Sequence, residues 1–431
     1  MTDRPVDAAP EPGEAIEPGG ESGASAGHGN IDGDEPAPRG SALEVLGQFT
    51  VLGLTSFGGP VAHLGYFRER LVVRRRWISE QGYAELVALA QFLPGPASSQ
   101  VGFALGLHRA GIRGGLAAFA AFTLPSAVLL VLAALSAPLL DGPIAEGLIA
   151  GLKVVAVAVV AHAVWGMART LTPDLRRAGI AVVAGLLVLL VGTGWATLAA
   201  IALGALAGLL LCRAGEVAAA GELSIPISRR AGAACLVAVG VLLLGLPLIA
   251  ALVPGTPLAV ADGFFRAGAL VFGGGHVVLP LLESAVVEPG WVTEQQFLAG
   301  YGAAQAVPGP LFTVAAFLGA SIAPGAEGVL LAGVALVAIF LPGLLLIVGV
   351  LPFWSALQGR PAVPALVRGA NAAVVGVLAA ALYDPVATSA LVDVPTVALA
   401  VLCTALLIVV RVPAWAVVIV GAGGGMLLGA F

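Results

Sequence analysis

The residues best suited to bind a ligand lie at two Pro-Gly-Pro breaks, Pro94-Gly95-Pro96 and Pro308-Gly309-Pro310, which stand 214 residues apart. A break in a membrane helix frees backbone N–H groups, and lipid tolerates these only where they line a cavity or bind a ligand. A helix that begins after proline loses nothing by the missing N–H, and its next N–H groups carry partial positive charge that favours anions. We therefore expect a small oxyanion at the breaks.

Side chains near both breaks would add hydrogen-bond donors. Ser98 and Ser99 follow the first break, Thr313 follows the second, and one glutamine stands three residues before each. The substrate-binding residues predicted at the breaks are Gln91, Pro94, Gly95, Pro96, Ala97, Ser98, Ser99, Gln305, Pro308, Gly309, Pro310 and Thr313.

A glycine cluster precedes each break, Phe57-Gly58-Gly59-Pro60 in one case and Phe272-Gly273-Gly274-Gly275 in the other. Glycine permits positive φ and a close approach of backbone to a ligand. Tight helix packing is the alternative explanation, since small residues serve it commonly in membranes. We include Phe57, Gly58, Gly59, Gly273, Gly274 and Gly275 in the predicted binding site.

Only two of the 20 basic residues, Lys153 and Arg266, fall inside apolar runs. A cation in a membrane is costly and therefore indicates function, so both are predicted to contact substrate. Asn371, a polar residue in the corresponding apolar run of the second half, is predicted with it. For Arg266 a structural ion pair with Asp262, four residues earlier, is equally supported.

His63 and His276 flank the glycine clusters, and Glu85 lies one turn into a later helix. Histidine titrates near neutral pH, so these three residues are candidates for proton coupling, although a lone histidine is more often structural. The sequence contains no cluster spaced for a metal, no phosphate-binding loop and no pairing of nucleophile and base. We predict no cofactor and no enzymatic activity.

The two breaks belong to a duplication. The glycine cluster, a tryptophan turn (77–81 and 291–295) and the Pro-Gly-Pro break recur in the same order at offsets of 214 or 215 residues. Trp occurs only six times in the chain, so chance is a poor explanation.

Composition indicates a membrane protein. The chain is 59% hydrophobic and 10% charged, whereas soluble domains carry about 25% charged residues. Its three cysteines lie in apolar runs and are predicted to be apolar fillers. Residues 1–41 carry nine acids and two arginines with few large apolar residues, so they should form a disordered acidic tail in the cytoplasm.

The apolar runs define the predicted organisation. A transmembrane helix needs about 20 residues, but the arms around the breaks are shorter, so we expect helical hairpins that are re-entrant or barely span. The fold class is an all-α polytopic membrane protein of two inverted repeats, each with two broken hairpins and four spans, plus one connecting span. The hairpins are predicted at 43–73, 81–109, 259–287 and 295–323, and the spans at 114–138, 145–168, 178–193, 195–212, 231–253, 326–350, 364–383, 394–410 and 413–431. The domains are 42–212, the loop and connecting span 213–253, and 254–431.

Arginine placement predicts the orientation. Cytoplasmic loops carry the excess of Lys and Arg. The hairpin loops of the first half are rich in arginine, while 274–294 and 319–328 contain none. The halves are therefore predicted to be inverted, with a cytoplasmic N-terminus and the C-terminus on the outer face. Inverted repeats with broken helices are typical of secondary transporters.

The same residues resemble a known family. Ser56 to Pro60 with His63, Trp77 to Glu80 and Pro94-Gly95-Pro96 look like the N-terminal domain of the chromate ion transporter family, and Val271 to Gly275, Trp291 to Glu294 and Pro308-Gly309-Pro310 look like its C-terminal domain. The resemblance covers roughly 43–431 and implies chromate efflux across the inner membrane, with resistance as the outcome.

Chromate has the shape and charge of sulfate, so a carrier or exchanger of sulfate or of another small anion is an alternative, as is an uncoupled anion channel. The predicted partners are the oxyanion, a coupling proton or counter-anion, and membrane lipid. A homodimer is compatible with the sequence, and no nucleic-acid partner is expected.

Overall fold

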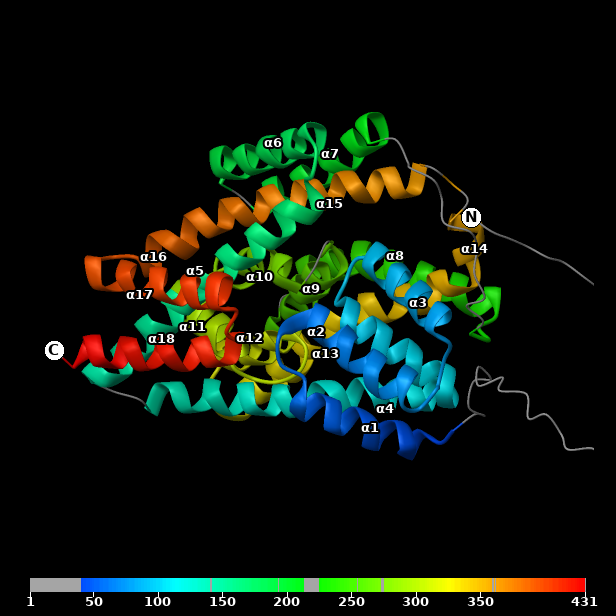
Figure 1. The fold of residues 1–431 in the computed structure, drawn as a ribbon, viewed down its shortest axis with the longest axis horizontal. Helices are drawn as coiled ribbons and strands as arrows, with labels where there is room; N and C mark the ends of the chain where they lie inside the picture. The colour runs from blue at the N-terminus through cyan, green and yellow to red at the C-terminus, as the bar shows by residue number, and fades with distance from the viewer. Residues whose placement is uncertain are drawn as a thin grey trace, which may run out of the picture. The chain divides into compact units, whose positions relative to one another are not determined.

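The computed structural model describes residues 40–139, 142–192, 194–212, 225–253, 255–272, 275–358, 360 and 362–430. Within these residues every regular element is helical and no strand is present (Figure 1). The predicted acidic tail up to residue 39, Gly273, Gly274 and most of the predicted loop after Cys212 lie outside the described residues.

The first half contains seven α-helices within the part of the chain that the structure describes. They are α1 (Ala42–Thr55), α2 (Gly59–Phe67), α3 (Glu80–Phe92), α4 (Ala97–Ser136), α5 (Pro143–Leu171), α6 (Leu175–Val191) and α7 (Gly194–Leu211). The connecting helix α8 (Arg229–Leu252) follows.

The second half repeats this order with more interruptions. Its helices are α9 (Thr256–Ala269), α10 (Val278–Val286), α11 (Glu294–Ala304), α12 (Val314–Ile322), α13 (Gly325–Val350), α14 (Trp354–Gln358), α15 (Ala362–Ala381), α16 (Thr388–Ala390), α17 (Val394–Ala405) and α18 (Ala414–Gly429).

The helices break at the predicted positions of the first half. The chain leaves α1 after Thr55 and enters α2 at Gly59, with φ of 103° at Gly58 and 77° at Gly59. These left-handed conformations favour glycine because other residues pay a steric penalty there. The Pro-Gly-Pro break lies between the end of α3 at Phe92 and the start of α4 at Ala97.

The second Pro-Gly-Pro break differs from the prediction. We expected an α-helix to begin directly after Pro310, but a 3-10 turn at Leu311–Thr313 comes first and α12 begins at Val314. The amide and hydroxyl groups of Thr313 both donate to the carbonyl of Pro310, at 3.0 and 2.7 Å. In this conformation those two donors are used inside the turn and do not point out of a helix terminus.

The arms predicted at 97–109 and 114–138 form one element, α4, which has a sharp kink. Ala110 has φ −142° and Gly111 has φ 63°, so both leave the helical region. The corresponding point of the second half is a full interruption between α12 and α13, where Ala323 is extended. The predicted boundary therefore exists in both halves, as a kink in one and a gap in the other.

Helix lengths support the mixture of spans and shorter helices. Five helices of the described chain are long and apolar enough to cross a membrane: Ala97–Ser136, Pro143–Leu171, Arg229–Leu252, Gly325–Leu357 and Ala362–Ala390. The runs predicted as spans at 178–193 and 413–431 fold as helices of 17 and 16 residues, which are shorter than a usual span of about 20.

The two halves interlock through helices with small residues at their crossings. Helix α5 packs on α18, and α15 packs on α7, so each half contributes its last helix to the other. A Cβ at Gly425 would stand 2.6 Å from the Cα of Gly151, and one at Gly208 would stand 2.7 Å from the Cα of Gly369. Glycine lets these backbones approach closely, as is common between membrane helices.

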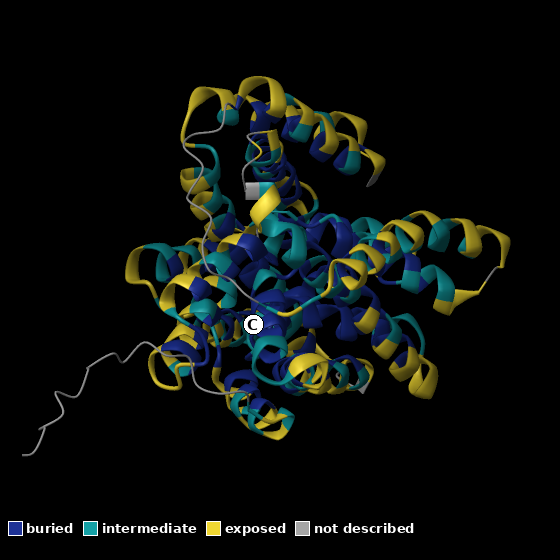
Figure 2. Ribbon diagram, turned by 90° about the vertical axis from the view of Figure 1, so that its right-hand side faces the viewer, coloured by how far each residue is buried: buried dark blue, intermediate teal, exposed yellow. Residues whose placement is uncertain are grey.

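Burial separates an interior from a lipid-compatible surface. Figure 2 shows buried residues inside the bundle and exposed residues along the outer faces of the peripheral helices. Many exposed residues are large and apolar, such as Leu190 (83% exposed), Val183 (67%) and Leu244 (71%). Apolar surface on this scale fits a hydrocarbon environment, so the chain is an all-α polytopic membrane protein.

Asp393 caps α17, the helix whose far end leads to the cavity described below. Hydrogen bonds from the amide and hydroxyl groups of Thr396, at 2.8 and 2.7 Å, hold the pKa of Asp393 below its usual value. A lowered folded-state pKa contributes stability above the unfolded pKa of about 3.9, and this stability is lost as pH falls through the folded value. Asp393→Asn should therefore unfold at a lower temperature than the parent at pH 7, and thermal unfolding scans should show this difference shrinking below about pH 4. An equal difference in unfolding temperature at pH 7 and below pH 4 would contradict this explanation of the lowered Asp393 pKa.

Candidate functional site

The two Pro-Gly-Pro breaks are tied to the opposite halves of the chain by reciprocal hydrogen bonds. Gly95 donates its N–H to the carbonyl of Val271 at 2.7 Å, and Gly309 donates its N–H to the carbonyl of Ser56 at 2.8 Å. Val271 and Ser56 each directly precede the Phe-Gly sequence of their own glycine cluster. Each break therefore contacts the residue directly before the glycine cluster of the other half, as expected of two inverted repeats.

Helices α4 and α13 complete this arrangement. Gln100 in α4 donates its side-chain amide to the carbonyls of Pro94, at 3.0 Å, and Gly343, at 3.1 Å. In the other half, the hydroxyl of Ser126 donates to the carbonyl of Pro308. Ser126 and Gly343 each follow a proline inside a helix, α4 and α13. These bonds satisfy carbonyls at both breaks. They stabilise the arrangement, since an unpaired buried carbonyl would be costly.

His63 belongs to the structural part of this network. Its Nε2 lies 3.2 Å from the Ser56 carbonyl, which also accepts from Gly309, and its Nδ1 lies 3.3 Å from the Ser98 hydroxyl. The side chain is only 1% exposed and stacks edge-on against Phe122. With Nε2 protonated, both ring nitrogens are satisfied by protein partners.

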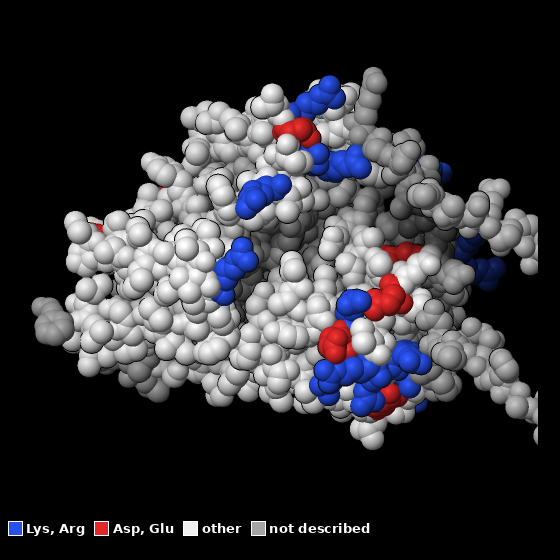
Figure 3. Space-filling view, viewed as in Figure 1, with Lys and Arg blue, Asp and Glu red and all other residues white. Residues whose placement is uncertain are grey.

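A cavity of about 830 Å³ opens beside the second break. Five of its lining residues were predicted from the sequence to bind substrate or couple protons. These are Gly58, Gly59, His276, Gln305 and Gly309. The face drawn in Figure 3 is hollowed near its middle, with separate basic side chains at the margin of the hollow.

The cavity has a positive lining. Arg169 stands in the last turn of α5, and Arg411 follows the end of the α17 segment. His162 and His276 add two imidazoles, and none of the described lining residues is Asp or Glu. Two guanidinium groups without an acid beside them are suited to a divalent anion, because arginine forks match oxyanion geometry.

Neither cavity arginine has an acidic partner among the residues that the structure describes. In the described residues no carboxylate oxygen lies within 4.0 Å of Arg169 or Arg411. The Arg169 guanidinium instead stands 5.9 Å from the centre of the Trp165 ring. By contrast, Arg109 pairs with Glu44 at 3.1 Å. The two cavity guanidiniums therefore keep donors for a ligand.

Arg411 also has an unusual backbone. Its φ of 63° and ψ of 36° are left-handed, a conformation that costs a non-glycine residue about 1 kcal/mol. Strained residues of this kind concentrate at functional sites. The strained backbone and the unpaired charge together mark Arg411 as a candidate site residue.

Two further groups point to a ligand in the cavity. The amide nitrogen of Gln305 is buried and has no hydrogen-bond partner in the described structure. Such a donor is costly unless something satisfies it. His276 contacts the Tyr301 hydroxyl through Nδ1 at 2.7 Å while lining the same cavity.

Several predicted site residues do not line this cavity. Gln91 lies exposed on α3, the ring of Phe57 packs on Trp415, and Glu85 accepts a hydrogen bond from Gln81 at 3.4 Å. The first break packs instead against α13: a Cβ on Gly95 would stand 3.0 Å from the Cα of Gly343. The remaining predicted residues outside the cavity lining are Pro94, Gly95, Pro96, Ala97, Ser98, Ser99, Lys153, Arg266, Gly275, Pro308, Pro310, Thr313 and Asn371.

The structure favours the ion-pair explanation for Arg266. Its guanidinium contacts the Asp262 carboxylate at 2.7 Å, and this carboxylate is only 8% exposed. Lys153 is partly buried in α5, on a different side of the helix from the cavity. The side-chain oxygen of Asn371 is buried without a partner among the described residues, which leaves its role as a prediction.

Sequence reasoning missed Arg169 and Arg411 as site residues. The arginines were interpreted only as markers of cytoplasmic loops, because they stand at the ends of apolar runs. One available signal was the absence of a neighbouring acid around Arg411 in the sequence, where 394–431 contains no Asp or Glu.

Comparison with known proteins is consistent with this arrangement. The family model described as chromate transporter matches residues 43–209 and again 258–426, one copy for each half. No solved structure shows significant similarity to the chain.

Three curated relatives are similar over most of their length. The "Chromate transport protein" of Cupriavidus metallidurans is 30% identical over 86% of this chain and 89% of its own. The protein of the same name from Pseudomonas aeruginosa is 30% identical over 80% and 82%, and the "Probable chromate transport protein" of Synechococcus elongatus is 29% identical over 83% and 88%. By its repeated match to the family model and its similarity to these proteins, the chain belongs to the chromate transporter family.

Proposed function

We propose that this chain is a secondary transporter that carries chromate out of the cell across the inner membrane. The single observation that supports this best is the cavity of about 830 Å³, whose described lining holds two arginines, glycines from both halves and no acid. The names of the curated relatives agree with the substrate.

The lining residues would bind a dianion through three kinds of contact. Arg169 and Arg411 would attract the anion by charge and bind it through paired N–H donors. Gln305 stands three residues before the second break. Its buried amide, which has no partner among the described residues, would replace part of the water shell of the anion. Gly58 and Gly59 would let backbone approach the oxygens, because they carry no side chain.

The direction of transport follows from the proposed orientation of the chain in the membrane. Positive loops are expected in the cytoplasm, so a cavity lined by Arg169 and Arg411 would receive anions from that side. At the repeat offset of 215 residues, Asp384 takes the place of Arg169. After the halves rearrange, a site edged by an acid would hold an anion less tightly, which would favour release outside.

Proton coupling is assigned to His276. Of the three predicted coupling residues, it alone lines the cavity, whereas His63 has both ring nitrogens satisfied by protein groups. Glu85 lies on α3 and lines none of the described pockets.

The test is uptake of radiolabelled chromate and sulfate into proteoliposomes, with and without an imposed pH gradient. We expect saturable chromate flux that sulfate inhibits and that the gradient accelerates. Linear flux with no dependence on a gradient or counter-anion would indicate an uncoupled channel. Faster sulfate flux, with chromate only as a weak competitor, would identify a sulfate carrier. No flux of either anion would refute the oxyanion function.

A further inference from the structure

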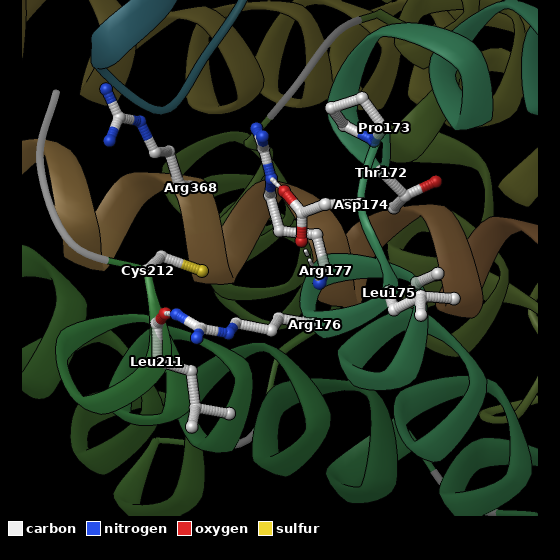
Figure 4. A pocket seen from close by; sticks show the side chains of 10 residues that line it. Thr172, Pro173, Asp174, Leu175, Arg176, Arg177, Leu211, Cys212 and Arg368 are labelled. Atoms are coloured by element: carbon white, nitrogen blue, oxygen red, sulfur yellow. Dashed lines mark hydrogen bonds and ion pairs between the residues drawn. The ribbon is translucent and has the colours of Figure 1, made fainter.

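A second positive pocket lies away from the cavity, between the start of α6, the end of α7 and α15. It measures about 800 Å³ and shares no lining residue with the cavity. Arg176 and Arg177 come from the first turn of α6, and Arg368 comes from α15 in the other half of the chain. Figure 4 shows the three arginine side chains around the same space, with Cys212 and Leu211 below Arg368.

The pocket keeps a positive balance after its internal pairing. Its described lining holds three arginines and one acid, Asp174. Asp174 caps α6 through the Arg177 amide at 3.0 Å and pairs with the Arg177 guanidinium at 2.6 Å, and these bonds hold its pKa below the usual value. Asp174 is therefore ionised at neutral pH and pairs with Arg177, and the positive charges of the described lining residues outnumber the negative ones by three to one.

Donors remain as well as charge. Arg176 donates one N–H to the carbonyl of Leu211, at 3.1 Å, near the end of α7. A guanidinium carries five N–H donors, so this bond fixes the side chain over the pocket and leaves others for a ligand. A planar group oriented in this way suits phosphate, which accepts paired hydrogen bonds.

The surroundings of the pocket are apolar and open. Leu175, which lines it, is 91% exposed, and Leu210 and Leu211 on the neighbouring helix are 75% and 45% exposed. In a membrane protein such exposed leucines face hydrocarbon. A ligand that fills the pocket and also covers this surface must be anionic at one end and apolar at the other.

We propose that this pocket binds the phosphate of an anionic phospholipid and that the bound lipid joins α6 and α7 of one half to α15 of the other. Basic pockets between membrane helices recognise lipid headgroups in this way. The ligand chemistry is a phosphate anion. A free oxyanion shares this chemistry, but it would gain nothing from the exposed leucines.

The experiment is native mass spectrometry of the full-length protein in detergent, titrated with phosphatidylglycerol, phosphatidylcholine or inorganic phosphate. We expect phosphatidylglycerol to bind at least tenfold more tightly than phosphatidylcholine, and inorganic phosphate not to displace it. Arg176→Gln combined with Arg368→Gln should weaken phosphatidylglycerol binding about tenfold or more, because each arginine contributes to headgroup attraction.

Two variants distinguish this site from general surface charge and from misfolding. Arg229→Gln with Arg230→Gln removes two exposed charges at the start of α8 and should leave binding unchanged. Arg176→Lys with Arg368→Lys keeps the charge and should retain most of the affinity. Equal losses in both glutamine pairs, no preference between the two lipids, or displacement by inorganic phosphate would each overturn the proposal.

Discussion

Replacing Arg169 and Arg411 together by glutamine is expected to lower chromate uptake into proteoliposomes at least 100-fold at low substrate concentration. Both guanidiniums line the cavity and neither has an acidic partner in the described part of the chain, so a bound dianion would be their principal counter-charge. A charge-assisted hydrogen bond contributes about 1.5–3 kcal/mol, and each 1.4 kcal/mol is a factor of ten in affinity. The loss should appear mainly as a higher KM. The two arginines would contact the anion both in the initial complex and during transport, so their replacement should weaken both states to a similar extent.

Two controls separate the cavity from overall charge. Arg113→Gln removes an exposed arginine of α4 that does not line the cavity and should transport like the parent. Arg411→Gly should relieve the left-handed backbone strain of about 1 kcal/mol, so this variant should be at least as stable as the parent while it transports poorly. If Arg169→Gln and Arg411→Gln transport as well as Arg113→Gln, the cavity is not the substrate path.

Replacing Gly309 by alanine is expected to destabilise the protein by at least about 2 kcal/mol, even though only one methyl group is added. The residue has φ 102°, and its Cβ would meet the Ser126 hydroxyl and come within 3.1 Å of the Phe122 carbonyl. Both the strained backbone and the clash oppose the reciprocal bond from Gly309 to Ser56. Thermal unfolding in detergent measures the effect, with Gly333→Ala in α13, where an added Cβ meets nothing within 4 Å, as the control.

A double variant separates the contribution of the steric clash to this loss of stability from that of the backbone strain. Ser126→Ala removes the hydroxyl that the new methyl group would meet, so Gly309→Ala with Ser126→Ala should recover part of the lost stability. The strain at φ 102° would remain, so full recovery is not expected. A Gly309→Ala variant that unfolds at the temperature of Gly333→Ala would show that the break is not held as described.

The sequence predicted those features that depend on local chemistry. Gly and Pro together disfavour helix continuation, so the breaks around Gly58 and Pro94 followed from residue types. Ser79 and Thr293 cap α3 and α11 through their side chains, which is local chemistry of the same kind. The length and apolar character of the runs gave the membrane class.

Features that depend on contacts between distant residues could not be predicted. The carbonyl that receives the Gly309 N–H belongs to a residue 253 positions earlier, and no local pattern identifies it. The Gln91 and Gln305 motifs are equivalent in sequence, yet only Gln305 lines the cavity, because Gln100 and Gly343 fill the space at the first break. The two halves therefore differ in conformation although their motifs are equivalent, and the repeat pattern in the sequence does not indicate this difference.

The reciprocal bonds between the two halves have a consequence for biosynthesis. Gly95 and Gly309 each depend on a carbonyl from the opposite half, and α7 and α18 pack on helices of the opposite half. A half inserted alone would leave a polar break and a glycine-lined helix face exposed to lipid. We therefore expect residues 1–212 or 225–431 to be degraded when synthesised separately, and the two fragments to assemble when produced together. Each half then acts as the assembly template for the other.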